Sequence, residues 1–332
     1  MTKLKVVVLL CMLAAAGCAT VHDRAASPTP TRSIETAKPQ WSEGRVMTRD
    51  GIRLFYRSIG QGQIPLVIPA GFYLEDALRP LAAHHRLIFY DPRCRGRSEC
   101  GDRAAVSLEW QIEDLESLRR GLGIESMALL GWSGLGMEMA QYTIRYPERV
   151  TRLIQVGAVP PSKAIMDAAG DRRSERIDAA AMSALQARMD AGEFEEKPAE
   201  LCRLYKAVTG PASFADRALA DKVPDVCVYE NEWPKNLWPY FGALLGSFGE
   251  WDLTEKLGAL SVPRLVIHGR EDGIPLAGAE AWASAGDSRL LVLSSAGHYP
   301  FLERPDEFFA AVKTFLAGDW PEGAVSRAME VS

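Results

Sequence analysis

The sequence has only five histidines among 332 residues and no uninterrupted run of lysine and arginine. Its formal net charge is −5, so no basic face for nucleic acid is expected. It also has no Gly-rich phosphate loop, no dinucleotide-binding fingerprint and no Cys/His cluster, so neither a cofactor nor a metal is expected. The remaining composition, 47% hydrophobic and 24% charged, is that of an ordinary globular protein with one large domain carrying an insertion, or with two domains.

The N-terminus has the pattern of a secretion signal. Two lysines precede an apolar run over residues 6–16, which is too short to span a bilayer but suits the core of a signal peptide. Residues 15–18, Ala-Ala-Gly-Cys, resemble a bacterial lipobox, in which cleavage before the cysteine allows acylation of Cys18. Plain secretion with an unmodified Cys18 is the alternative.

A lipid on Cys18 would anchor the protein to a membrane. We expect residues 1–17 to be the signal peptide and residues 18–40, rich in Ser, Thr, Pro and Ala, to be a flexible tether. Ala19, in place of an aspartate after the cysteine, resembles the sorting pattern for the outer membrane. The expected location is therefore the periplasm, after export across the inner membrane, with a lipid anchor in the outer membrane.

Four cysteines remain once Cys11 and Cys18 are set aside. An even number in an oxidising compartment permits disulfides, and pairing of sequence neighbours is one of three connectivities. Free buried thiols are the alternative. The four residues are Cys94, Cys100, Cys202 and Cys227.

Short apolar runs alternate with helical patterns along most of the chain. This alternation predicts an α/β fold, with a mostly parallel sheet covered by helices on both faces. Apolar residues at helical spacing predict helices over 108–122 and 305–316. Strands are predicted at 44–59 (two, joined by a turn), 66–69, 87–90, 127–130, 150–156, 263–268 and 289–293.

The alternation stops between residues 160 and 250. That segment has no strand-like run, is helical over 167–190 and then becomes rich in aromatic residues. It is predicted to be a helical cap inserted into the core. The predicted divisions are 41–159 for the first part of the core, 160–250 for the cap, 251–320 for the second part of the core and 321–332 for a tail.

The stretch 128–137 predicts a nucleophile elbow. A short apolar strand leads into Gly131-Trp132-Ser133-Gly134, and a helical segment follows. A serine on such a strand-to-helix turn is held above the sheet, beside backbone N–H groups that bind negative charge. Its hydroxyl also needs a base, and among the five histidines His298 is the best placed, in a Gly-bounded loop after the last strand.

Five blocks together resemble the α/β-hydrolase superfamily over residues 41–320, and the sequence is most similar to the capped serine hydrolases that resemble proline iminopeptidase. The resemblance implies a cofactor-free acyl-enzyme mechanism with Ser133, His298 and Asp272 as the triad, with Glu271 as the nearest competitor for the acid. It also implies an oxyanion hole made by the backbone N–H groups of Gly134 and Phe72. The blocks are 69–72, 90–98, 131–136, 269–272 and 297–305.

One departure from the family's pattern bears on the elbow. Leu135 stands two places after the nucleophile, where a small residue is usual because the helix packs closely on the strand. The glycines on either side could relieve this crowding.

Residues that bind the substrate are predicted in the cap and beside the nucleophile. Aromatic side chains would form an apolar wall, and a carboxylate would bind the ammonium group of an aminopeptidase substrate; ordinary packing or a solvated surface is the alternative for each. The substrate is expected to be a small ester, an amide or a short peptide. A proline iminopeptidase-like enzyme is the leading prediction, an esterase or lipase is the alternative, and a catalytically inactive binding protein, perhydrolysis or C–C bond hydrolysis remain open. The predicted binding residues are Trp132, Glu230, Glu232, Trp233 and Trp238.

Overall fold

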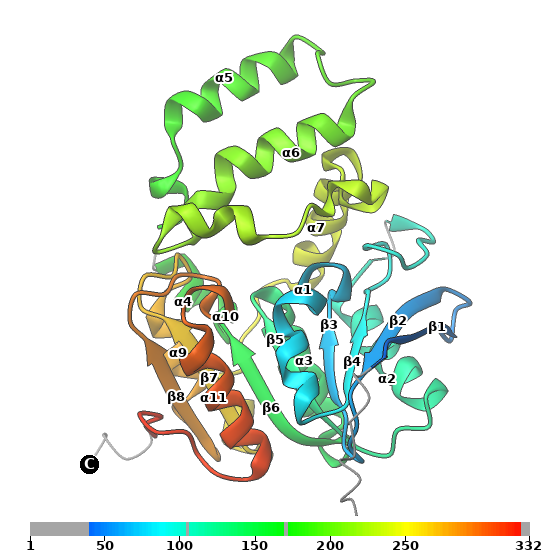
Figure 1. Ribbon diagram of the computed structural model, residues 1–332, viewed down its shortest axis with the longest axis vertical. Helices are drawn as coiled ribbons and strands as arrows, with labels where there is room; N and C mark the ends of the chain where they lie inside the picture. Colours follow the sequence, from blue (N-terminus) through cyan, green and yellow to red (C-terminus); the bar gives the residue numbers. More distant parts are fainter. Residues whose placement is uncertain (1–39, 104–105, 169–171, 327–332) are drawn as a thin grey trace, which may run out of the picture. The chain divides into compact units, whose positions relative to one another are not determined.

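The structure is a computed structural model that describes residues 40–103, 106–168 and 172–326 (Figure 1). The predicted signal peptide, nearly all of the predicted tether and Cys18 lie outside the described residues. None of the helices in the described ranges is long and apolar enough to cross a membrane.

The core is an eight-stranded sheet with the strand order β1-β2-β4-β3-β5-β6-β7-β8. The first two strands form an antiparallel hairpin, β2 pairs antiparallel with β4, and the remaining pairs are parallel, so the predicted mostly parallel α/β sheet is confirmed. The strands are β1 Ser42–Met47, β2 Arg53–Ile59, β3 Leu66–Pro69, β4 Leu87–Tyr90, β5 Met127–Trp132, β6 Val150–Val156, β7 Arg264–Gly269 and β8 Ser288–Leu293.

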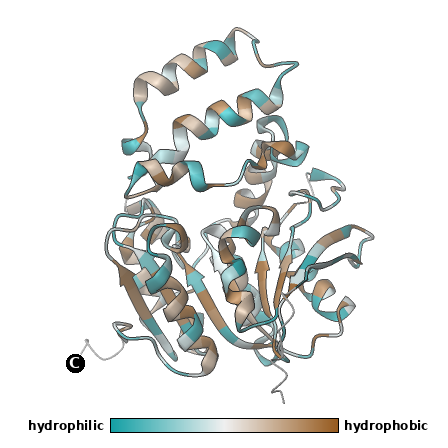
Figure 2. Cartoon of the chain, in the orientation of Figure 1, coloured by the Kyte–Doolittle hydropathy of each residue, from teal (hydrophilic) through white to brown (hydrophobic). Residues whose placement is uncertain are grey.

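Helices cover both faces of this sheet because its central strands are apolar on both sides. Alternate strand residues belong to two hydrophobic clusters, one shared with α2, α3 and α9 and the other with α1 and α11. Figure 2 shows the central strands as hydrophobic ribbons. These helices are α1 Gly71–Leu78, α2 Leu108–Gly121, α3 Gly134–Arg145, α9 Leu276–Trp282 and α11 Pro305–Ala317, with the short α8 Thr254–Leu257 and α10 Pro300–Glu303.

The segment predicted to be the cap is helical in its described residues. Its helices are α4 Lys163–Ala168, α5 Ala179–Asp190, α6 Pro198–Thr209 and α7 Pro234–Phe248, and α5 and α6 lie above the carboxyl ends of the parallel strands (Figure 1). The single helical stretch expected over 167–190 is broken. A new helix begins at Ala179, and the side chain of its N-cap residue Asp178 accepts hydrogen bonds from the N–H groups of Ala180 and Ala181.

Sequence neighbours form the disulfides. Cys94 pairs with Cys100 in the loop after β4, and Cys202 pairs with Cys227 within the cap. The second bond ties α6 to a short 3₁₀ turn at Val226–Val228 and so fixes two parts of the cap to each other. Of the three connectivities that the sequence left open, the structure therefore selects one.

Candidate active site

Ser133 lies on a sharp turn between β5 and α3. Its φ is 59° and its ψ is −131°, a combination that non-glycine residues rarely adopt and that is typically found at functional sites. Its backbone N–H donates to the carbonyl oxygen of Val156 at 2.9 Å, which fixes the turn to the neighbouring strand β6. The side chain does not cap α3, so the hydroxyl is not engaged by the helix that it precedes.

The bulk of Leu135 does not disturb this turn. Close packing between helix and strand is provided by Gly131 and Gly136, since a Cβ on Gly131 would lie 2.7 Å from the Cα of Gly136. The Leu135 side chain instead packs in a small apolar cluster with Ala70 and Phe72. Gly136, three places after Ser133, therefore takes the role of the small residue that the family usually has two places after the nucleophile.

Asp272 and His298 lie together at the carboxyl end of the sheet. The Nδ1 atom of His298 is 2.9 Å and 3.0 Å from the two carboxylate oxygens of Asp272. Burial acts to raise the pKa of Asp272, but the His298 ring and the N–H of Ile274 outweigh it and hold the pKa below its usual value. A Cβ on Gly157, which follows β6, would lie 2.7 Å from the Asp272 carboxylate, so only glycine allows this approach.

The loop that carries His298 is held by both the core and the cap. The indole N–H of Trp132 donates to the His298 carbonyl oxygen at 2.7 Å, and the two rings lie 4.8 Å apart between centroids. The His298 N–H donates to the carbonyl oxygen of Ser213 in the cap at 2.8 Å. The carboxylate of Glu303 accepts from the N–H groups of Gly297 and Ala215, which joins the same two parts.

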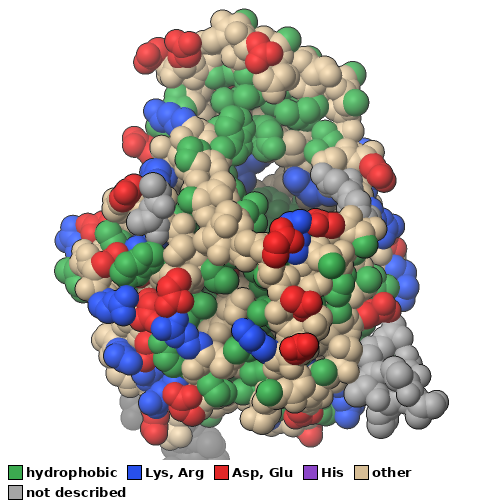
Figure 3. All heavy atoms as spheres, turned by 180° about the vertical axis from the view of Figure 1, so that it is seen from behind, with side chains coloured by type: hydrophobic (Ala, Val, Ile, Leu, Met, Phe, Trp, Pro, Cys, Tyr) green, Lys and Arg blue, Asp and Glu red, His purple; other side chains and the backbone are tan. Residues whose placement is uncertain are grey.

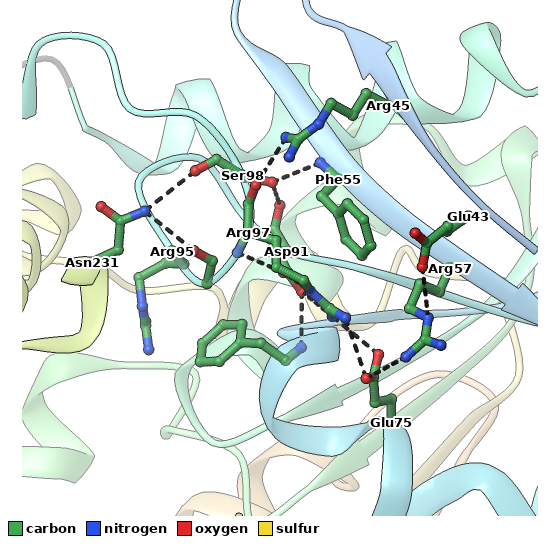
Figure 4. Close-up of polar contacts among 12 residues, drawn as sticks. Glu43, Arg45, Phe55, Arg57, Glu75, Asp91, Arg95, Arg97, Ser98 and Asn231 are labelled. Atoms are coloured by element: carbon green, nitrogen blue, oxygen red, sulfur yellow. Dashed lines mark hydrogen bonds and ion pairs between the residues drawn. The ribbon is translucent and has the colours of Figure 1, made fainter. Parts of the chain in front are cut away.

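The two backbone N–H groups expected to form the oxyanion hole differ in their hydrogen bonding. Gly134 is the first residue of α3, where backbone N–H groups have no partner within the helix. The Phe72 N–H, in contrast, donates to a carboxylate oxygen of the buried Asp91 at 2.9 Å. Figure 4 shows that Asp91 also faces Arg97, which in turn bonds Glu75. Asp91 therefore already uses the N–H of Phe72 that was predicted to be the second oxyanion donor.

A family model described as the alpha/beta hydrolase fold matches residues 68–305, which is well over half of the chain. The chain belongs to the α/β hydrolase fold family. Solved structures agree on the fold of this hydrolase. A serine hydrolase from the polyaromatic hydrocarbon-degrading bacterium Cycloclasticus zankles superposes with a TM-score of 0.63 at 18% identity and covers 84% of this chain and 99% of its own.

The relatives of this hydrolase include enzymes of two kinds. A pimeloyl-[acyl-carrier protein] methyl ester esterase of Aeromonas hydrophila is 28% identical over 77% of this chain and 96% of its own length. A proline iminopeptidase of Lactobacillus helveticus is 25% identical over 80% of this chain and 95% of its own. The similarity thus supports hydrolase chemistry and does not separate esterase from peptidase.

Glu232, predicted to bind a substrate ammonium group, forms an ion pair with Arg95 inside the protein. Its carboxylate forms two bonds of 2.8 Å with the guanidinium of Arg95 and accepts the Gly96 N–H at 3.1 Å. The side chain is buried, and burial alone would lower the pKa of Arg95, but the Glu232 carboxylate raises it. Glu138, near the same guanidinium, carries a pKa that burial raises to about 8. Glu232 is therefore a structural ion-pair partner, which corrects the prediction.

The other predicted binding residues are dispersed. Glu230 is exposed, and the Trp233 indole N–H donates to the Cys227 carbonyl oxygen within the cap. Trp132 packs between Tyr73 and His298 and so positions the histidine loop. Of these four residues only Trp238 lines the cavity between the cap and the core, where it contacts the ring of Tyr205 edge-on.

Removal of the Glu232 charge should destabilise the protein. Glu232→Gln is expected to lower the free energy of unfolding by about 3–5 kcal/mol, because it leaves the Arg95 guanidinium without its main partner in a buried place. The measurement is urea unfolding of the wild type and the variant. The matched control is Glu230→Gln, an exposed neighbour that should change stability by less than about 0.5 kcal/mol. Equal effects of the two substitutions would contradict a buried ion pair.

Sequence reasoning missed several residues around the predicted triad. Tyr73 and Tyr299 each follow a predicted site residue, and their hydroxyl oxygens are 2.6 Å apart. Glu303 lies in the block 297–305, five residues after His298, where a turn of helix brings it back toward the loop. The signal for Tyr299 and Glu303 was their place in the block 297–305, and for Tyr73 its place directly after the block 69–72. Arg173 and Lys206, which line the cavity between the cap and the core, belong to no motif and had no such signal.

Proposed function

We propose that this protein is a serine hydrolase that cleaves a small ester through an acyl-enzyme intermediate. Ser133 Oγ attacks the ester carbonyl carbon while its proton passes to Nε2 of His298, and the same proton then goes to the departing alcohol. Water attacks the acyl-enzyme in the second step, again giving a proton to His298, and the acid is released as Ser133 recovers its proton. Asp272 holds the ring with Nδ1 protonated and stabilises the imidazolium.

The contact between His298 Nδ1 and the Asp272 carboxylate is the observation that carries this proposal. With Nδ1 donating to Asp272, the Nε2 atom is left as a proton acceptor. The strained turn at Ser133 supports its role as nucleophile. The backbone N–H of Gly134, at the start of α3, supports the role of oxyanion donor. The order Ser133, Asp272, His298 along the chain is the one expected for this fold.

An ester is favoured over the amide substrate of an iminopeptidase. An aminopeptidase needs a carboxylate that is free to pair with the substrate's ammonium group. Of the two carboxylates predicted for this role, Glu232 is already paired with Arg95, and Glu230 is exposed and does not line the cavity between the cap and the core. Asp221 lines that cavity but is exposed to solvent, where pairing with an ammonium group contributes little. The iminopeptidase version would require Glu232 to leave a buried bidentate ion pair, which is costly.

The test is labelling of the protein lacking residues 1–18 with a fluorophosphonate probe, which reacts covalently with an activated serine. The wild type should be labelled, and labelling should be lost in both Ser133→Ala and His298→Ala. Labelling that survives in either variant would move the nucleophile or the base to another residue. A folded wild-type protein that does not react would favour the catalytically inactive alternative.

We also propose that Cys18 is acylated and anchors this enzyme to the outer membrane, as its lipobox-like sequence indicates. The full-length chain expressed in a Gram-negative host should then fractionate with outer membranes and be extracted by detergent. Cys18→Ser should appear in the soluble periplasmic fraction or remain unprocessed. A wild-type chain that is soluble without detergent would contradict the anchor and favour plain secretion.

A further inference from the structure

A cavity of about 460 Å³ lies between the cap and the core, and its volume is typical of small-molecule sites. From the core its wall includes Tyr73 and Tyr299, and the Tyr299 ring is 5.8 Å from the His298 ring between centroids. Figure 3 shows a hollow between the cap and the core, with hydrophobic side chains above it and positively charged ones beside it. The cavity is therefore one aromatic ring away from the proposed base.

Two cations from the cap line this cavity. The Nζ atom of Lys206, on α6, lies over the Tyr73 ring, 5.4 Å from its centroid. Arg173 is held by the Ser213 hydroxyl, to which its Nε donates at 2.8 Å, and by the carbonyl oxygen of Thr209 at 3.2 Å. Within the described residues, neither cation is in an ion pair with a carboxylate.

The three carboxylates that line the same cavity do not neutralise them. Glu232 is used by Arg95, and the Asp225 carboxylate is 2.8 Å from Arg203. Asp221 is exposed to solvent.

The position of Lys206 is electrostatically unfavourable without an anion. Burial lowers the pKa of Lys206, and the nearby charges of Arg95 and Arg173 add to this effect, while Glu232 and Asp225 oppose it. Two like charges that line one cavity repel one another, and an anion between them would relieve the repulsion. The hydroxyl pair of Tyr73 and Tyr299 adds a donor, because only one of its two protons is used between them.

We propose that Arg173 and Lys206 bind a carboxylate at the far end of the substrate's acyl chain, so that the substrates are half-esters of dicarboxylic acids. This rests on the proposed ester hydrolysis at Ser133. The aromatic wall beside Tyr299 contacts the carbon chain, and the two cations hold its charged end. The charge belongs on the acyl part because that part stays bound through both acylation and deacylation, whereas the alcohol leaves after the first step.

The first test compares two substrates of equal carbon number, mono-4-nitrophenyl adipate and 4-nitrophenyl hexanoate. The ratio of their kcat/KM values should favour the adipate ester by about 10- to 100-fold in the wild type, the range expected for a charged hydrogen-bonded contact. Arg173→Gln and Lys206→Gln should each reduce this ratio about tenfold or more. Lys222→Gln, which removes an exposed positive charge from the same cap, is the matched control and should leave the ratio unchanged.

A wild-type ratio near or below one, or a ratio that neither substitution lowers, would overturn the proposal. Fluorophosphonate labelling of the same samples separates this result from failure of the hydrolase itself. Normal labelling of Ser133 without an adipate preference would refute the carboxylate site and leave the proposed hydrolysis standing.

A binding measurement keeps the carboxylate site testable even if no ester is turned over. Adipate should bind Ser133→Ala in calorimetry, and the affinity should fall about tenfold or more when Arg173→Gln or Lys206→Gln is added. The neutral analogue 1,6-hexanediol should bind more weakly than adipate by a similar factor. Equal affinity for the two compounds would overturn the site independently of catalysis.

Discussion

Ser133→Ala should lower kcat for hydrolysis of 4-nitrophenyl hexanoate by about 10⁶-fold, the scale seen when a serine hydrolase loses its nucleophile. The expectation rests on the position of Ser133, on a strained turn whose side chain does not cap the helix that follows. Its structural bond, from the backbone N–H to Val156, does not involve the hydroxyl and should persist. The free energy of unfolding should therefore fall by less than about 1 kcal/mol, or rise.

Steady-state kinetics and thermal unfolding of the same preparations measure both parts of this prediction. Ser284→Ala is the matched control, since Ser284 is exposed and its hydroxyl only donates to a carbonyl oxygen one turn earlier. Its turnover should equal that of the wild type. Hydrolysis by Ser133→Ala at more than a hundredth of the wild-type rate would mean that another group is the nucleophile.

Asp272→Asn should lower kcat by about 10⁴-fold with little change in the fold. The aspartate oxygens accept from His298 Nδ1 at 2.9 Å and 3.0 Å, and so they fix which ring nitrogen carries the proton. An asparagine can present its NH₂ group to Nδ1, which favours the tautomer protonated at Nε2 and removes the base. The loss of the buried negative charge also leaves the imidazolium without its counter-ion.

Glu271→Gln tests whether the neighbouring carboxylate is the acid instead. In the structure the Glu271 carboxylate accepts the N–H of Ala296 at 3.0 Å, which is a bond that supports the loop. Its substitution should lower kcat less than about tenfold. A loss in Glu271→Gln as large as that in Asp272→Asn would show that the acid is misassigned.

The α/β fold could be predicted from the sequence because its signals are local. Runs such as Leu66–Pro69 and Leu87–Tyr90 are apolar throughout, as expected for strands that are buried on both faces. Turn residues precede and follow these runs. The helix over 305–316 has regular apolar spacing and begins at a proline that suits a first helical turn. The local signal was misleading over 167–190, where α5 begins only at Ala179, after the N-cap residue Asp178.

Contacts between distant residues decided what local patterns could not. Glu232 looked like a free carboxylate in an aromatic segment, yet it pairs with Arg95, which is 137 residues earlier in the chain. The Phe72 N–H looked available, yet the buried Asp91 accepts it. In both cases the partner of a charge or a backbone donor depends on which elements the tertiary fold brings together.

The class of fold, the order of its elements and the positions of Ser133, Asp272 and His298 could all be read along the chain. These follow from turn residues, apolar runs and short motifs, each of which acts within a few residues. Only the tertiary structure decided the disulfide pairing, the place of Leu135 and the pair of cations, Arg173 and Lys206, in one cavity. Coulomb forces and packing act through space, so the groups that meet in the cavity under the cap were not visible along the chain.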